Sequence, residues 1–68
     1  MATGEQFDAV IKAVVDNVMV STGMALRLDL HPDAIADALT LGFIERRSRD
    51  LYPTEAGQEY RHGIEDED

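Results

Sequence analysis

The side chains best suited to chemistry in this chain are three arginines, Arg46, Arg47 and Arg49. They make up half of the chain's six basic side chains. A guanidinium group keeps its charge and donates two parallel hydrogen bonds to a phosphate, so such a cluster can hold a nucleic-acid backbone. The same arginines can instead form surface ion pairs with Glu45, Asp50 or the acidic C-terminal residues, each worth less than about 1 kcal/mol. The sequence leaves both interpretations open.

Residues for catalysis or metal binding are sparse. The two histidines, His31 and His62, lie far apart in the sequence, and the chain has no cysteine to complete a metal site. The acidic C-terminal run lacks the ligand spacing and the turn glycine of a calcium loop. The sequence contains no glycine-rich phosphate loop and no recognisable nucleophile–base pair. We therefore expect no enzymatic activity, no cofactor and no metal ion.

Acidic residues dominate the charge. Asp and Glu outnumber Lys and Arg by 14 to 6, which gives a formal net charge of −8 at pH 7. Such a charge repels nucleic acid overall, because affinity for DNA comes largely from neutralising phosphates. The simplest interpretation is a solvated acidic surface that keeps the protein soluble. The composition, with Lys12 as its single lysine, also suits a halophilic cytoplasm, where salt screens exposed charges. A third interpretation is a negative surface shaped for a basic protein partner.

The elements that must position these residues begin with a helix over residues 5–20. Asp8, Lys12 and Asp16 recur every four positions there and form one polar stripe. The apolar arc that remains is too wide for one small core to cover. Either a second copy of the chain shares this arc or the arc docks on another protein. Of the two we expect the homodimer, with an interface formed by Phe7, Val10, Ile11, Val14 and Val18.

Two further helices are predicted in the next part of the chain. Ser21 offers N-cap chemistry for a short helix over roughly 23–29, although alternating apolar residues make a short strand a competitor there. His31 and Pro32 open the following helix, and Gly42 ends it. The inner face of that helix carries Ile35, Ala38 and Leu39, and its outer face carries Asp33 and Asp37.

The C-terminal part predicts a hairpin and a last helix. Residues 43–46 and 51–54 form short strand-like runs on either side of a polar stretch that contains the arginines. Thr54 then caps a helix over 55–61, which Gly63 ends. The acidic residues that follow predict a solvated, partly disordered tail.

The chain's 68 residues are enough for one domain. We expect a flexible N-terminus over residues 1–4, one domain over 5–63 and an acidic tail over 64–68. No apolar run approaches the roughly 18 residues that span a bilayer. No signal peptide is visible at the start of the sequence, so we expect a cytoplasmic location.

Three segments, residues 25–35, 41–47 and 49–60, resemble a winged helix-turn-helix domain. The first looks like the turn and helix entry of MarR-like regulators, the second like their exit into the wing, and the third like the return strand of the wing. The chain is most similar to haloarchaeal phage-repressor-like winged-helix proteins. The resemblance implies a mainly α fold with a small β-hairpin wing. It also implies that the third helix enters the DNA major groove while the wing grips the neighbouring backbone.

The predicted third helix departs from that pattern because it carries no basic residue. We therefore do not expect it to read bases. The first hypothesis is a small dimeric winged-helix protein, a transcriptional regulator, that contacts double-stranded DNA through Arg46, Arg47, Arg49 and Thr40. The alternative is an acidic interaction module on the same fold, a DNA mimic or phage-type inhibitor, that docks a basic protein and does not bind DNA.

Overall fold

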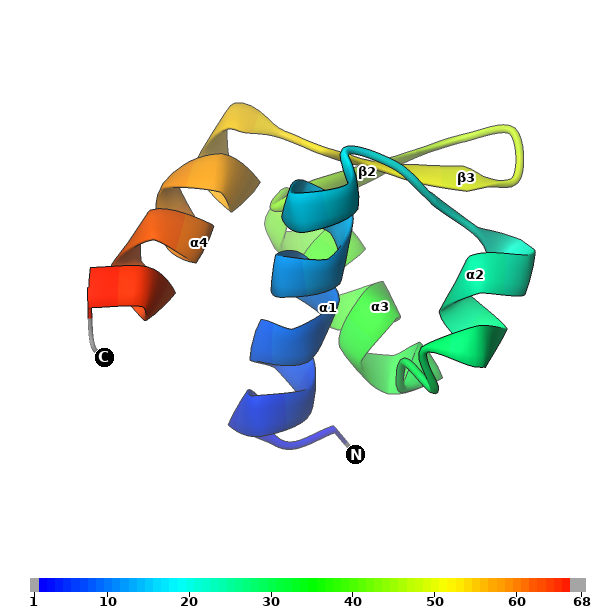
Figure 1. Cartoon of the computed structure of the whole chain (residues 1–68), viewed down its shortest axis with the longest axis horizontal. Helices are drawn as coiled ribbons and strands as arrows, with labels where there is room; N and C mark the ends of the chain where they lie inside the picture. The colour runs from blue at the N-terminus through cyan, green and yellow to red at the C-terminus, as the bar shows by residue number, and fades with distance from the viewer. Residues whose placement is uncertain (1, 67–68) are drawn as a thin grey trace.

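The computed structural model describes residues 2–66, which form a mostly helical chain with one small antiparallel sheet. The elements in chain order are α1 (Gly4–Asn17), β1 (Val20–Ser21), α2 (Thr22–Arg27), α3 (Pro32–Leu41), β2 (Ile44–Arg47), β3 (Asp50–Pro53) and α4 (Glu55–Asp66). In Figure 1, α1 and α3 lie at the centre beneath the sheet, with α4 on one side and α2 on the other. The predicted combination of helices with a small hairpin is confirmed, and the short strand β1 was not expected.

Helix α1 begins close to its predicted start but ends early. The Gln6 amide donates to the Thr3 hydroxyl at 3.1 Å, and the Thr3 amide donates to the Gln6 side chain at 2.8 Å. This capping box satisfies two amides that a helix start otherwise leaves unpaired. The helix ends because Val18 takes a left-handed conformation with φ of 66°. The predicted end at residue 20 is therefore wrong, and Val20, whose branched side chain suits a strand, pairs with β3 instead.

Local capping chemistry sets the bounds of α2 and α3. The Met24 amide donates to the Ser21 hydroxyl at 3.2 Å, and the segment that follows is a helix rather than the competing strand. The Asp33 amide donates to Nδ1 of His31 at 3.1 Å, so His31 caps α3 as predicted. Gly42 ends α3 with φ of 81°, a conformation that glycine adopts without a Cβ clash. The predicted α3 is confirmed at both ends.

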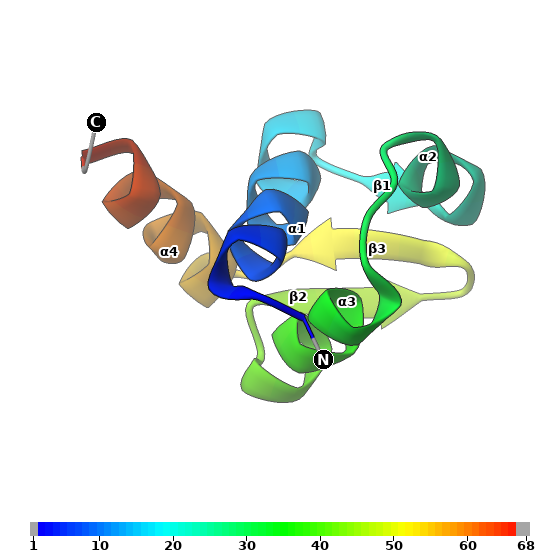
Figure 2. The same ribbon diagram turned by 90° about the horizontal axis from the view of Figure 1, so that it is seen from below.

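The three strands form a sheet in the order β1-β3-β2, with both pairs antiparallel. Figure 2 shows β3 in the middle of this sheet. Arg47 pairs with Asp50, which leaves Ser48 and Arg49 as the hairpin loop. Ser48 has φ of 59°, as the first loop position of such short hairpins requires. Strand β2 begins one residue later than predicted, at Ile44.

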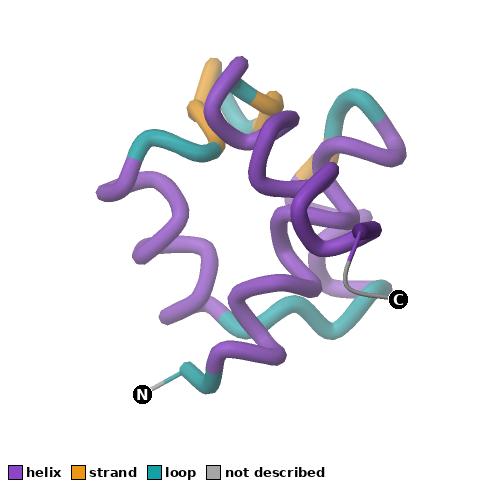
Figure 3. The backbone as a smooth tube through the Cα atoms, turned by 90° about the vertical axis from the view of Figure 1, so that its left-hand side faces the viewer, coloured by secondary structure: helices purple, strands orange, loops and turns teal. Residues whose placement is uncertain are grey.

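Helix α4 is anchored at its start and is longer than predicted. The Gly57 amide donates to the Thr54 hydroxyl at 3.1 Å, and that hydroxyl donates to the Gly42 carbonyl at 2.6 Å. Figure 3, viewed from the side of α4, shows the helix descending from the strands toward the C-terminus. The helix continues through Gly63 to Asp66, so the prediction that Gly63 ends it is wrong. A glycine costs a helix only about 1 kcal/mol, and packing against α1 supports this one. Residues 67–68 of the predicted tail lie outside the described residues.

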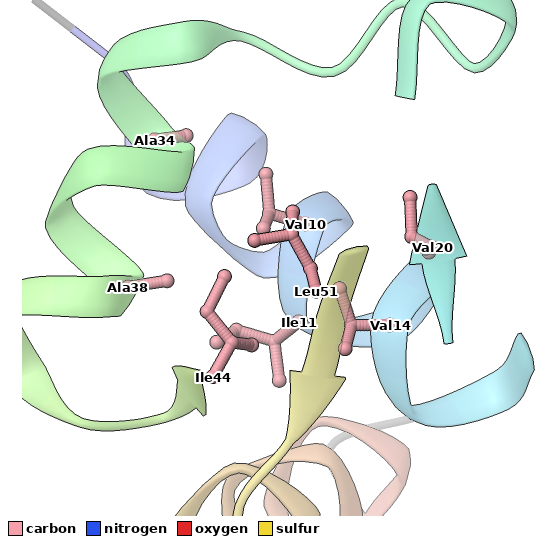
Figure 4. Close-up of a cluster of buried hydrophobic side chains, with 8 residues drawn as sticks. All are labelled: Val10, Ile11, Val14, Val20, Ala34, Ala38, Ile44 and Leu51. Carbon is pink, nitrogen blue, oxygen red and sulfur yellow. The ribbon is translucent and has the colours of Figure 1, made fainter. Parts of the chain in front are cut away.

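One hydrophobic core joins the central helices to the sheet (Figure 4). Full burial of a valine, isoleucine or leucine side chain stabilises a fold by about 1.5–3 kcal/mol. The two alanines on α3 have small side chains, which lets this helix lie close to α1. The core residues come from α1, α3 and all three strands, and they are Val10, Ile11, Val14, Val20, Ala34, Ala38, Ile44 and Leu51.

The core overturns most of the predicted dimer interface. Val10, Ile11 and Val14 have no exposed surface in the single chain, so they cannot contact a second copy. Phe7 is half-buried and packs edge-on against two aromatic rings of the same chain, with centroid distances of 5.8 and 5.5 Å. Only Val18 is mostly exposed, at 68%. The apolar arc of α1 is wide because α3, the sheet and α4 of the same chain all pack around this central helix.

Candidate nucleic-acid interface

The three clustered arginines lie at the closed end of the β2–β3 hairpin, and all three are exposed. Arg46 and Arg47 are the last residues of β2, and Arg49 lies in the loop. In Figures 1 and 2 this closed end lies at the same side of the molecule as α2, and α4 lies at the opposite side. The arginines therefore lie on the surface of the molecule, at the side away from α4.

Strand alternation divides the arginines between the two faces of the hairpin. Arg46 lies opposite the buried Leu51 and shares its face with the buried Ile44. Arg47 lies on the outer face together with Glu45, because successive side chains of a strand point to opposite sides. The structure therefore does not bring all the guanidinium groups together on one face.

Arg47 is engaged by two neighbours on that outer face. Its Nη2 atom lies 2.7 Å from Oε1 of Glu45, and its guanidinium carbon lies 5.5 Å from the centre of the Tyr52 ring. Tyr52 is the cross-strand partner of Glu45, so the three side chains form one cluster. For Arg47, the ion-pair interpretation is the one that the structure supports.

Arg49 is held through its backbone rather than through its side chain. The hydroxyl of Thr22, the first residue of α2, donates to the Arg49 carbonyl at 2.9 Å. This bond joins the hairpin loop to α2, and no local sequence pattern signals it, because the two residues are 27 positions apart. In the part of the chain that the structure describes, neither Arg46 nor Arg49 pairs with a carboxylate.

Thr40, the fourth predicted contact residue, lies elsewhere. It sits in the last turn of α3, near the start of β2, whereas the arginines lie at the far end of that strand. Its hydroxyl donates to the Ala36 carbonyl at 2.9 Å. The residue lines a shallow groove between α3 and the start of α1, together with Phe7 and Leu41. The structure therefore does not bring Thr40 together with the arginine cluster.

The helices beside the hairpin carry mixed charge. Asp33 and Asp37 are exposed on α3, which has no basic residue. Carboxylates at these positions oppose the approach of phosphates. Arg27, in the last turn of α2, is exposed and adds a cation that sequence reasoning did not assign to the site. The hairpin and α2, rather than α3, therefore provide the positive charge at this side of the molecule.

The described surface offers little else for chemistry. Within residues 2–66, no group of three or more acidic or histidine side chains is placed to hold a metal ion. No helix in this range is both long and apolar enough to cross a membrane. A second shallow groove runs between α1 and α4 and is lined by Glu5, Asp8, Ala9, Lys12 and Ile64.

Comparison with known proteins identifies no relative. No family model matches the chain, and it matches no curated protein and no solved structure. The interpretation of the arginine cluster therefore rests on its geometry and on the sequence.

Proposed function

We propose that the protein is a winged helix-turn-helix protein that binds the backbone of double-stranded DNA with its β2–β3 hairpin and acts as a transcriptional regulator. The observation that carries this proposal is the placement of Arg46 and Arg49 at the exposed, closed end of the hairpin. Neither arginine is paired with a carboxylate of the described residues. Exposed guanidinium groups of this kind contact phosphates and so position a protein on a duplex.

The arrangement of α2 and α3 supports the proposal. They are joined by residues 28–31, a length typical of the turn in a helix-turn-helix. Within that turn Asp29 has φ of 57°, a left-handed conformation that aspartate tolerates better than most residues. Helix α3 then leads directly into the hairpin, which is the order that the family resemblance implies.

The charge distribution favours backbone contact over base recognition. The exposed side chains of α3 include Asp33 and Asp37 but no arginine, lysine, asparagine or glutamine. Those absent types make most of the hydrogen bonds that distinguish bases in the major groove. With a net charge of −8 and few phosphate contacts, we expect binding to be weak and strongly dependent on salt.

A salt titration of binding to a labelled duplex, followed by fluorescence anisotropy, tests the proposal. The protein concentration should reach about 100 μM, because non-specific dissociation constants lie near 10⁻⁴–10⁻⁶ M. We expect the logarithm of the binding constant to fall linearly with the logarithm of salt concentration. The double variant Arg46→Ala/Arg49→Ala should flatten that slope by about 1.8 per chain. Lys12→Ala, which removes one exposed cation from α1, is the matched control and should leave the slope unchanged.

A homodimer is part of the proposal, because two chains would bring two hairpins to one duplex. Val18 and Met19, 68% and 39% exposed just beyond the end of α1, are the exposed large apolar side chains nearest the predicted interface in the sequence. Leu26, Leu28 and Leu41 are also exposed. We expect sedimentation equilibrium to give a dimer that Val18→Asp weakens. A wild-type chain that sediments as a monomer at 100 μM, about the highest concentration the DNA titration needs, would remove the dimer from the proposal.

A second candidate is the acidic interaction module, which the outer face of α3 favours. Asp37 is exposed there, and Leu41, at the end of the same helix, is 62% exposed. The variant Asp37→Asn distinguishes the two functions. It should strengthen DNA binding if phosphates approach this face, because it removes a repulsive charge. It should leave DNA binding absent, and weaken capture of a basic protein, if the acidic face is the functional one.

A further inference from the structure

The hairpin presents its arginines unequally. The charge of Arg47 already faces Glu45 at 2.7 Å, and its guanidinium lies over the Tyr52 ring. The two charged side chains are 70% and 43% exposed, so a phosphate can approach them but must compete with the carboxylate. The carboxylate stays two residues away on the same strand face, so it also repels the phosphate that displaces it.

The other two arginines meet no such competitor. Arg46 lies on the opposite face of β2, away from Glu45, because the two are adjacent in the strand. Arg49 lies in the loop, where the bond from the Thr22 hydroxyl to its carbonyl fixes the backbone and leaves the side chain exposed. Their charges are therefore available to a ligand without competition from Glu45, whereas a phosphate that binds Arg47 must displace that carboxylate.

We propose that Glu45 takes the place of a phosphate on Arg47, the third arginine of the hairpin, by pairing with its guanidinium. Each chain then holds phosphates with Arg46 and Arg49, while Glu45 and Tyr52 keep Arg47 on the outer face. In this arrangement Glu45 acts as a built-in competitor that limits the affinity for DNA. The inference rests on the proposed function, since it assigns roles within the same site.

Anisotropy titrations of the full chain against a mixed-sequence duplex test this inference. Glu45→Gln removes the carboxylate that pairs with Arg47 and leaves Asp50, the cross-strand partner of Arg47, in place. We therefore expect the salt slope to steepen by up to about 0.9 per chain, the value of one added phosphate contact. Affinity would then fall up to about 3.5-fold more than in the wild type between 50 and 200 mM salt. Glu55→Gln, the same charge change on an exposed residue of α4, is the matched control and should not steepen the slope. Thermal unfolding followed by circular dichroism establishes that each variant is folded.

The effect of Arg47→Ala on the salt slope completes the test, because we expect it to differ between the wild-type chain and the Glu45→Gln chain. In the wild-type chain it should leave the slope unchanged, and in the Glu45→Gln chain it should abolish the steepening. Two results would overturn the inference: a Glu45→Gln slope no steeper than that of Glu55→Gln, or an Arg47→Ala slope as flat as that of Arg46→Ala. Failure of the wild-type chain to bind the duplex at low salt would instead overturn the proposed function.

Discussion

Gly57 lies where α4 meets the junction between α3 and β2, and a methyl group has no room there. A Cβ at this position would overlap the carbonyl oxygen of Phe43 and would lie 2.9 Å from the carbonyl carbon. The Phe43 backbone is held in place on both sides: its carbonyl accepts from the Thr54 amide at 3.2 Å, and its amide donates to the Ala38 carbonyl at 3.0 Å. The substitution Gly57→Ala therefore forces a shift of the backbone rather than of a flexible side chain.

The size of the effect follows from three terms. Overpacking a close-packed site costs about 1–3 kcal/mol. Weakening the hydrogen bonds of the Phe43 backbone adds about 1 kcal/mol for each bond. Alanine is favoured over glycine in a helix by about 1 kcal/mol, which offsets part of the loss. We expect Gly57→Ala to lower the free energy of unfolding by about 2–3 kcal/mol, or the Tm by about 10–20 °C for a domain of this size.

Thermal and urea unfolding followed by far-ultraviolet circular dichroism measure this change, with Gly63→Ala as the control. Gly63 is in the same helix, and no atom lies within 4 Å of where its Cβ would be. Gly63→Ala should therefore stabilise the protein by about 0.5–1 kcal/mol. If both variants prove equally stable, or if Gly57→Ala is the more stable, the docking of α4 against Phe43 described above is incorrect.

Three further substitutions, at two residues with positive φ and at one helix cap, test the stability of other elements. Val18→Gly should raise the free energy of unfolding of the single chain by about 0.5–1 kcal/mol, because an exposed β-branched residue there holds a left-handed φ of 66°; a lower urea midpoint at a protein concentration where the chain is monomeric would contradict this. Ser48→Gly should raise the Tm by a few degrees, because glycine suits the first loop position with φ of 59°. Thr54→Val should lower the free energy of unfolding by about 1–2 kcal/mol, since it loses both the α4 cap and the bond to the Gly42 carbonyl. Thr54→Ser keeps the hydroxyl and should retain most of that stability in the same urea titration.

The features that sequence predicts well are those with local chemistry. Ser21, His31 and Thr54 each cap a helix through a bond to an amide two or three residues away, so the pattern that predicts the cap also contains its partner. Gly42 ends α3 for an equally local reason, the left-handed conformation at one residue. The starts of α2, α3 and α4 and the end of α3 were therefore predictable without any knowledge of the tertiary structure.

Features that depend on distant partners were not predictable. The apolar run continues through Val18 and Val20, so periodicity alone does not reveal that α1 ends at Asn17 and that a strand follows. That strand exists because Val20 pairs with Leu51 from the other half of the chain. The apolar arc of α1 indicated a second copy of the chain, but α3, the sheet and α4 of the same chain cover it.

The sequence predicted where the candidate site lies but not which contacts each of its arginines makes. The arginine cluster and its hairpin were predicted, but the strand was placed one residue too early. The predicted strand ended at Arg46, so the position of Arg47 beside Glu45 on the outer face of the strand required the observed strand bounds. The bond from Thr22 to the Arg49 carbonyl likewise depends on how α2 packs against the hairpin.

The most direct test of the proposed function is the salt titration of wild-type binding to a double-stranded DNA. If the hairpin holds DNA through Arg46 and Arg49, the logarithm of the binding constant falls linearly with that of salt concentration. The slope then flattens by about 0.9 per chain when either arginine is replaced by alanine. If the folded protein shows no binding at about 100 μM and low salt, or if its slope is the same without these arginines, the hairpin is not a DNA-binding site.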